Sequence, residues 1–401
     1  MGETRLLTVH LDGANIVTVD CQEKVCSVAF HPDGRHIVGG GWEGKLRRWD
    51  VEDGHEVGEA MEAGYPVFAV GVSRDGRWIV TGGRAGKVNV WDARTHQKVI
   101  EAEGHRDTVV AIDISPDSAT FVTGSGDRTA IVWDIRTGQK RVGALEHDYR
   151  VHVVKFSPGV FVAGDRLATV QAHSAPVHIF DSRSGKLLVK TQVETGSRLN
   201  ANLVWSQDGQ KIFVAPCHAN KILCLNGVTG SLLAEWATHD TPAQFPSLAS
   251  SGLSNLLALQ YGDHISFWDT ASANKRVGSV VEHARPQSGV SLALSPDDNH
   301  LVTTGEDKKI TIRRLRPILS QSYVINAFSS ENPQRTVIRS PGMPVVEAEP
   351  HSPQPPQGIV SCPRAQRELC VHLMVSFSAM GRSSVTTHAC QQCSFQSVDT
   401  R

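Results

Sequence analysis

Several features common in membrane, secreted and nucleic-acid-binding proteins are missing from this sequence. No apolar run approaches the length needed to span a bilayer. The N-terminal MGETRLLTVHLDG has neither the apolar core nor the cleavage site of a signal peptide. Charge of neither sign predominates, since 40 Lys and Arg face 41 Asp and Glu, which leaves a net charge of −1. We therefore expect an intracellular protein, cytoplasmic, nuclear or both, that binds neither a membrane nor nucleic acid directly.

The 8 cysteines do not form a disulfide framework. Four of them, Cys21, Cys26, Cys217 and Cys224, lie on or beside strand-like segments without regular spacing, which is typical of reduced thiols. The other four lie beyond residue 361, and only Cys390 and Cys393 have the spacing of zinc ligands, which is half of a site. The sequence therefore predicts no metal and no cofactor.

An internal repeat dominates the first three quarters of the chain. Three segments align without gaps, IVGGGWEGKLRRWD, IVTGGRAGKVNVWD and FVTGSGDRTAIVWD, and their tryptophans Trp49, Trp91 and Trp133 are 42 residues apart. Four weaker copies follow at spacings of 43 to 47 residues, with Phe180, Leu225, Trp268 and Arg313 at the tryptophan position. A period near 40 to 45 residues with a recurring Trp-Asp is typical of four-stranded propeller blades.

The seven copies predict the fold and its limits. Short runs of Val, Ile and Phe alternate with Asp-Gly and Ser-Gly turns, as half-buried antiparallel strands require. We expect an all-β protein in which residues 1–316 form a seven-bladed β-propeller of four-stranded antiparallel blades. Residues 317–401 are rich in proline and poor in large apolar residues over their first part, so we expect a low-complexity, disordered C-terminal tail.

Over about residues 23–315 the chain resembles the WD-repeat family. The resemblance implies that a strand from the N-terminus, within residues 5–11 or 15–19, completes the seventh blade and closes the ring. The alternative is an open ring with an unpaired N-terminus, which would leave a free sheet edge.

The resemblance also implies a hydrogen-bonded relay of four residues in each blade. His105, Thr123, Asp127 and Trp133 match all four positions in the third blade. The second blade keeps Thr81 and Trp91, and the seventh keeps His283, Thr303 and Asp307. A hydroxyl, a His and an Asp together also occur in catalytic triads. Because these residues recur with the repeat and the hydroxyl lies on a strand, we interpret the relay as structural.

Propellers of this family bind partners chiefly on the face that carries the loops before the first strand and between the second and third strands. Aligning the copies places a set of aromatic, basic and His residues on that face. These candidate partner-binding residues are Trp42, Tyr65, Arg84, Arg150, His173, His218 and Tyr261. Trp, Tyr and Arg dominate interface hot spots, so the set predicts a surface that binds other proteins or peptides. His173 and His218 lack a third metal ligand.

These observations favour a non-enzymatic scaffold or adaptor that takes no small-molecule substrate. One alternative is a reader of modified peptides in a chromatin or ubiquitin-ligase complex, in which Trp42 and Tyr261 form a cage for a methylated cation or Arg84 and Arg150 hold phosphate. A second alternative is a propeller hydrolase. It would need a carboxylate cluster, and the same positions offer Glu306 alone.

Overall fold

The computed structural model describes residues 6–11, 14–159, 165–172, 176–191, 202–217, 220–238, 246–261, 264–271, 275–282, 291–321 and 323, with side chains from residue 16 onward. The C-terminal tail predicted beyond residue 316 lies outside these residues from 324 onward.

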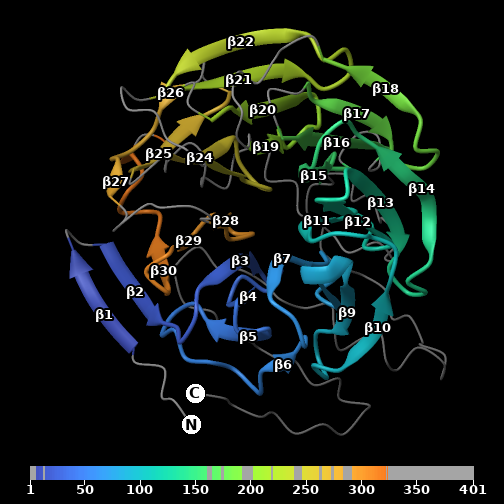
Figure 1. The fold of residues 1–401 in the computed structure, drawn as a ribbon. Coiled ribbons are helices and arrows are strands. Elements are labelled where there is room, and N and C mark those ends of the chain that lie inside the picture. The colour runs from blue at the N-terminus through green and yellow to red at the C-terminus, as the bar shows by residue number, and fades with distance from the viewer. Residues whose placement is uncertain are drawn as a thin grey trace, which may run out of the picture. The chain divides into compact units, whose positions relative to one another are not determined.

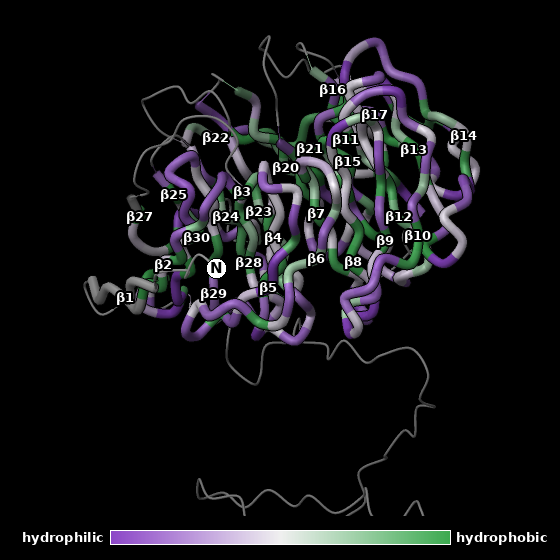
Figure 2. Tube along the Cα trace, turned by 60° about the horizontal axis from the view of Figure 1, so that its bottom comes forward, coloured by the Kyte–Doolittle hydropathy of each residue, from purple (hydrophilic) through white to green (hydrophobic). Residues whose placement is uncertain are grey.

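The described strands form seven antiparallel sheets, and each sheet is one blade. Figure 1 shows the blades arranged as a ring, with the first strand of each repeat nearest the centre. Figure 2 shows that hydrophobic residues follow the strands, whereas hydrophilic residues collect in the connecting turns. The prediction of an all-β, seven-bladed propeller is confirmed.

Blades 1 to 3 have four strands each, in order from the centre outwards. They are β3 (Val25–Phe30), β4 (His36–Gly41), β5 (Lys45–Asp50) and β6 (Met61–Glu62); β7 (Val67–Val72), β8 (Trp78–Gly83), β9 (Val88–Asp92) and β10 (Lys98–Ala102); β11 (Val109–Ile114), β12 (Thr120–Ser125), β13 (Thr129–Asp134) and β14 (Lys140–Glu146). A 3-10 turn, η1 (Arg84–Gly86), joins β8 to β9.

Blades 4 to 6 follow the same order. They are β15 (Val151–Phe156), β16 (Arg166–Gln171), β17 (His178–Asp181) and β18 (Leu187–Lys190); β19 (Asn202–Trp205), β20 (Lys211–Ala215), β21 (Lys221–Asn226) and β22 (Leu232–Ala237); β23 (Ser247–Ser250), β24 (Leu256–Tyr261) and β25 (His264–Asp269), with the short β26 (Lys275–Arg276) and β27 (Val281–Glu282) both paired to β25.

Blade 7 joins the two ends of the propeller. Its sheet runs β28 (Leu292–Leu294), β29 (His300–Thr304), β30 (Lys309–Arg314), β2 (Ala14–Asp20) and β1 (Leu6–Leu11). Strand β2 pairs with β30, with Val17 opposite Ile312, and β1 adds a fifth strand outside β2 (Figure 1). Val17 and Val19 are buried with Ile310 and Ile312, so hydrophobic burial fixes this pairing. Of the two N-terminal segments considered above, the later one closes the ring.

The core lies between blades rather than within them. Among the described residues the buried apolar side chains form seven clusters, and each cluster joins two neighbouring blades. The cluster between blades 2 and 3, for example, brings Val80 and Val90 against Phe121 and Trp133. One blade is a single sheet with two apolar faces, so it needs a neighbour on each side.

The Asp of each Trp-Asp pair ends its strand by holding the next turn. In blade 3, Oδ1 of Asp134 accepts hydrogen bonds from the N–H groups of Arg136 and Thr137, both at 3.0 Å. Gly138 follows with a φ of +68°, and a Cβ there would lie 2.5 Å from Ile100 in the outer strand of blade 2. The turn therefore locks one blade onto the preceding one, and only glycine fits at its tip.

The folded part of the chain continues beyond the boundary predicted at residue 316. Ile318, Leu319 and Tyr323 are buried in the cluster between blades 6 and 7. The carbonyl of Ile318 accepts a 3.0 Å hydrogen bond from the N–H of Ser279. Blade 6 has only the two short outer pieces β26 and β27, and these residues supply apolar cover beside them. These residues follow the last copy of the repeat, so the repeat pattern carried no signal for them.

No helix among the described residues is long and apolar enough to cross a membrane.

Candidate functional site

The four relay residues of blade 3 form a continuous chain of hydrogen bonds. Nδ1 of His105 lies 2.9 Å from Oδ2 of Asp127, and Nε2 lies 2.7 Å from the hydroxyl of Thr123. The indole Nε1 of Trp133 donates to the same hydroxyl at 2.8 Å. Because an ionised carboxylate only accepts, Nδ1 carries the imidazole proton, and the Thr123 hydroxyl donates to Nε2. The chain therefore ties the incoming loop to β12 and β13.

The electrostatics of the relay favour a neutral imidazole beside an ionised carboxylate. Burial lowers the pKa of His105, and the carboxylate of Asp127 opposes part of this effect. Burial alone would raise the pKa of Asp127. Hydrogen bonds from the Thr129 hydroxyl, the Arg106 N–H and His105 outweigh it, so this pKa is lowered. Thr123 is fully buried between its two partners, which gives its hydroxyl no access to an external substrate.

Blades 2 and 7 keep the central hydroxyl and change its partners. In blade 2, Nε1 of Trp91 donates to Thr81 at 3.0 Å. In blade 7, Arg313 replaces the tryptophan, and its Nη1 donates to Thr303 at 3.1 Å. Burial lowers the pKa of Arg313 to about 10, while Asp307 favours its charged form. His283 lies outside the described residues.

The sequence comparison missed a His–Thr pair in blade 4. Nε2 of His147 lies 2.8 Å from the Thr169 hydroxyl, and the imidazole of His147 stacks on that of His178 with ring centres 5.2 Å apart. Blade 4 has one extra residue between its second and third strands, which shifted the alignment. The position of His147 could have revealed the pair, because His105 and His147 each stand four residues before the first strand of their blade.

Trp42 is the most exposed aromatic side chain on the loop face of blade 1. It follows β4 and is 51% exposed, and its ring meets Phe68 of β7 edge to face with centres 5.4 Å apart. Arg84 in η1 and Arg150 before β15 are also exposed, and Tyr149 beside Arg150 is 45% exposed. The loop face of blades 1 to 4 therefore presents two aromatic side chains with arginines between them.

Comparison with known families agrees with this architecture. Residues 1–223 of the 401 match the family described as Nucleolar protein 10-like, N-terminal domain. The chain belongs to this family. Residues 274–313 also match the WD domain, G-beta repeat, which confirms the expected WD-repeat character. A search of curated proteins finds no match. As a class, WD-repeat propellers are protein-interaction scaffolds.

Two predicted binding residues of this nucleolar protein 10-like propeller pack against the core. Tyr261 is 2% exposed, and its hydroxyl donates to the Pro216 carbonyl and accepts from the Asn220 N–H, both at 3.0 Å. It therefore does not form an aromatic cage with Trp42. Tyr65 is half-buried in the cluster between blades 1 and 2. Burial raises the pKa of Tyr65 to about 12, with a small opposing effect from the Thr81 hydroxyl.

The remaining two candidates are not placed. His173 and His218 lie outside the described residues. Of the seven predicted binding residues, the structure therefore leaves Trp42, Arg84 and Arg150 on the exposed loop face.

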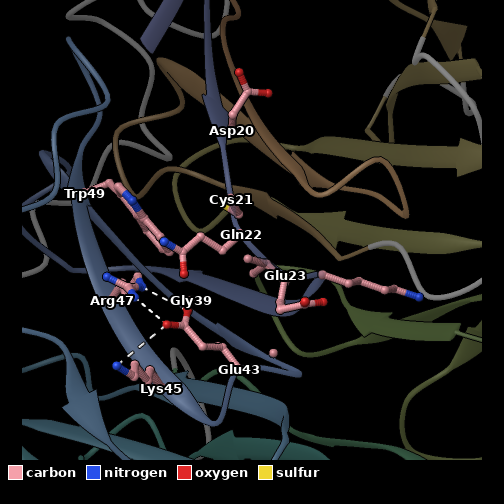
Figure 3. Close-up of a pocket in the computed structure, with 13 residues that line it drawn as sticks. Asp20, Cys21, Gln22, Glu23, Gly39, Glu43, Lys45, Arg47 and Trp49 are labelled. Atoms are coloured by element: carbon pink, nitrogen blue, oxygen red, sulfur yellow. Dashed lines mark hydrogen bonds and ion pairs between the residues drawn. The ribbon is translucent and has the colours of Figure 1, made fainter. Parts of the chain in front are cut away.

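Blade 1 has a small cavity where blade 3 has its relay. Cys21, Gly39 and Glu43 stand at the positions of His105, Thr123 and Asp127, and they line a cavity of about 50 Å³ together with Trp49 (Figure 3). Arg47 closes one side through ion pairs to Glu43 at 2.5 Å and Glu56 at 2.8 Å. Burial raises the pKa of Cys21 to about 12, so its thiol stays protonated and unreactive.

Proposed function

We propose that this propeller is a non-enzymatic scaffold that binds another protein through the loop face of blades 1 to 4. We name this surface the loop-face arc. It consists of Trp42, Phe68, Arg84, Arg106, Arg128, Tyr149 and Arg150. The proposal rests chiefly on Trp42, whose indole is held against Phe68 while half of its surface faces solvent. A preorganised, exposed Trp among arginines is typical of an interface anchor.

The arc is one continuous surface because each blade touches the next through its loops. A Cβ at Gly86, in the turn of blade 2, would clash with the carbonyl oxygen of His105 in the loop before blade 3. The N–H of His147, in the loop before blade 4, donates to the carbonyl oxygen of Arg128 in the turn of blade 3 at 2.9 Å. A partner lying across the arc would therefore contact several blades whose relative positions are fixed by the core.

The buried relay supports a structural rather than a catalytic role for its residues. The Thr123 hydroxyl and the His105 imidazole are engaged with each other and with the blade, and both residues are buried. The family description refers to a nucleolar protein, so we propose that this chain also acts in the nucleus, at the nucleolus.

Crosslinking and quantitative mass spectrometry on the tagged full-length chain in cells would test the proposal. The double variant Trp42→Ala and Tyr149→Ala should lose partners that the wild-type chain retains. Leu188→Ala with Leu233→Ala is the matched control, since these side chains are 46% and 50% exposed on the outer strands of blades 4 and 5. Loss of the same partners in both double variants, or in neither, would contradict a loop-face site.

A further inference from the structure

The centre of the loop-face arc carries four exposed arginines. Arg84 lies in the turn of blade 2, Arg106 and Arg128 lie on the two loops of blade 3, and Arg150 precedes blade 4. Within the described residues none of the four has a carboxylate oxygen within 4.0 Å. Four guanidinium groups on adjacent loops thus face solvent without an ion pair there.

The loops that carry these arginines touch one another. The N–H of Arg106 donates to Oδ2 of Asp127 at 2.9 Å, which joins the two loops of blade 3. A Cβ at Gly126 would lie 2.6 Å from Oδ2 of Asp107, beside Arg106. The N–H of His147 donates to the carbonyl oxygen of Arg128 at 2.9 Å, which joins the Arg128 loop to the loop that carries Arg150. Together with the contact of Gly86 to His105, these contacts make the four loops neighbours.

The carboxylates of the same loops each have a partner within the protein. Asp127 belongs to the relay, and Oδ1 of Asp107 accepts from the N–H of Thr108 at 2.7 Å. Oδ2 of Asp148 lies 3.8 Å from Nζ of Lys190. The loop face of blades 7 and 1 differs, because its basic groups are paired: Lys24 with Glu306 and Lys308 with Glu23, both at 3.3 Å.

We propose that the arginines of the loop-face arc bind an acidic segment of the partner protein, through Asp and Glu side chains that supply the missing carboxylates. The proposal rests on the scaffold function above and adds the chemistry of the partner. A guanidinium group holds a carboxylate with two parallel hydrogen bonds, so each arginine fits one acidic side chain.

A peptide suits this surface better than a nucleic acid. Asp107, Asp127 and Asp148 lie beside Arg106, Arg128 and Arg150 on the same loops, so the positive charge occurs at separate points. Nucleic acid is bound by a continuous basic surface, whereas acidic side chains spaced along a peptide match separate points. The aromatic side chains of Trp42 and Tyr149 at the two ends of the arc would contact apolar residues that flank the acidic segment.

Fluorescence anisotropy on the purified full-length chain would test this chemistry. The probes are labelled peptides of Asp, Glu and Gly residues, the same peptide with phosphoserine in place of Asp and Glu, a Lys and Gly peptide, and a single-stranded RNA. Arg84→Gln with Arg128→Gln removes two arc arginines. Arg94→Gln with Arg136→Gln is the matched control, because both are exposed arginines in turns after the third strands, at the other ends of blades 2 and 3.

The wild-type chain should bind the Asp and Glu peptide, and added salt should weaken binding. The arc variant should weaken it by about tenfold, while the control variant should stay within about twofold. Tighter binding of the RNA, binding of the phosphoserine peptide alone, equal binding of the Lys peptide, or equal loss in both variants would overturn the proposal. The two proposals can fail separately. If the Trp42→Ala and Tyr149→Ala variant loses partners in cells and the Arg84→Gln and Arg128→Gln variant keeps them, the scaffold function stands and the acidic partner is excluded.

Discussion

In blade 7 the guanidinium of Arg313 donates to the hydroxyl of Thr303, as the indole of Trp133 donates to Thr123 in blade 3. A charged group thus makes the hydrogen bond that an indole makes elsewhere. Arg313 is 5% exposed and packs within the blade that closes the ring. Removing it would leave both a void and an unsatisfied hydroxyl at the point where the two ends of the chain meet.

We therefore expect Arg313→Ala to lower the free energy of unfolding by about 2–4 kcal/mol. The adjacent Arg314→Ala is the control. Arg314 pairs with Glu52, but its side chain is 46% exposed, and an exposed ion pair contributes less than about 1 kcal/mol. Urea unfolding followed by tryptophan fluorescence measures both. Equal losses in the two variants would show that the bond to Thr303 does not stabilise the blade.

Asp127 is expected to stabilise blade 3 through the relay. Asp127→Ala should cost about 1–3 kcal/mol, because it leaves the buried Nδ1 of His105 without its carboxylate. Asp53→Ala serves as the control, since its side chain is 57% exposed and accepts a local 2.9 Å hydrogen bond from the N–H of His55. The melting temperatures of the two variants give the comparison. If Asp127→Ala has the same melting temperature as the wild type, the relay does not stabilise the blade.

The stacked histidines of blade 4 should make the propeller sensitive to acid. Burial lowers the pKa of His178 from 6.5 to about 4, aided by His147 and Lys190 and opposed by Asp148. As the pH falls, His178 takes up a proton near pH 6.5 in the unfolded chain and only near pH 4 in the folded chain. Stability is therefore full above pH 6.5 and falls as the pH drops toward 4.

His178→Ile should remove part of this acid sensitivity, because Ile131 occupies the equivalent register position in blade 3. At pH 5 the variant should exceed the wild type by roughly 2 kcal/mol more than at pH 7, following from about 1.4 kcal/mol per pH unit. Urea unfolding at the two pH values measures the difference. Parallel pH dependence in both proteins would mean that His178 is not the group responsible.

The N-terminal strand should matter for the whole ring. Deleting residues 1–20 removes β1 and β2 and exposes the edge of β30, so we expect a large drop in melting temperature or association of the chain. Val19→Asp should reproduce the drop in melting temperature, because Val19 is fully buried. Thr18→Asp should have a small effect, because the neighbouring Thr18 is only half-buried. Differential scanning calorimetry and light scattering measure both. A deletion variant that stays monomeric with an unchanged melting temperature would contradict closure by β2.

The repeat made the fold predictable from the sequence. The orientations and partners of individual side chains depend on packing and could not be predicted in the same way. Seven copies spaced by 42 to 47 residues define seven blades whatever their individual residues are. Tyr261 and Tyr65 have the residue type of an interface anchor, but the space beside them in the core decides that they point inward. The His147–Thr169 pair was hidden by a single extra residue in a loop. Whether an arginine has a carboxylate partner likewise depends on which loops lie beside it in the fold. The order of residues in the sequence does not show this.

The pairing of β2 with β30 also sets the order in which the protein is completed. Ile16 pairs with Arg313, so β2 must wait for a strand that is translated about 300 residues later. Blades 1 to 6 assemble from contacts close in the chain, which form early, while the joint between the ends closes late because it spans almost the whole domain. Until then β2 has no β30 to pair with in the growing chain. Chaperones that hold exposed strands would therefore act on this protein before translation of β30 ends, and a pause in translation before residue 309 would prolong that exposed state.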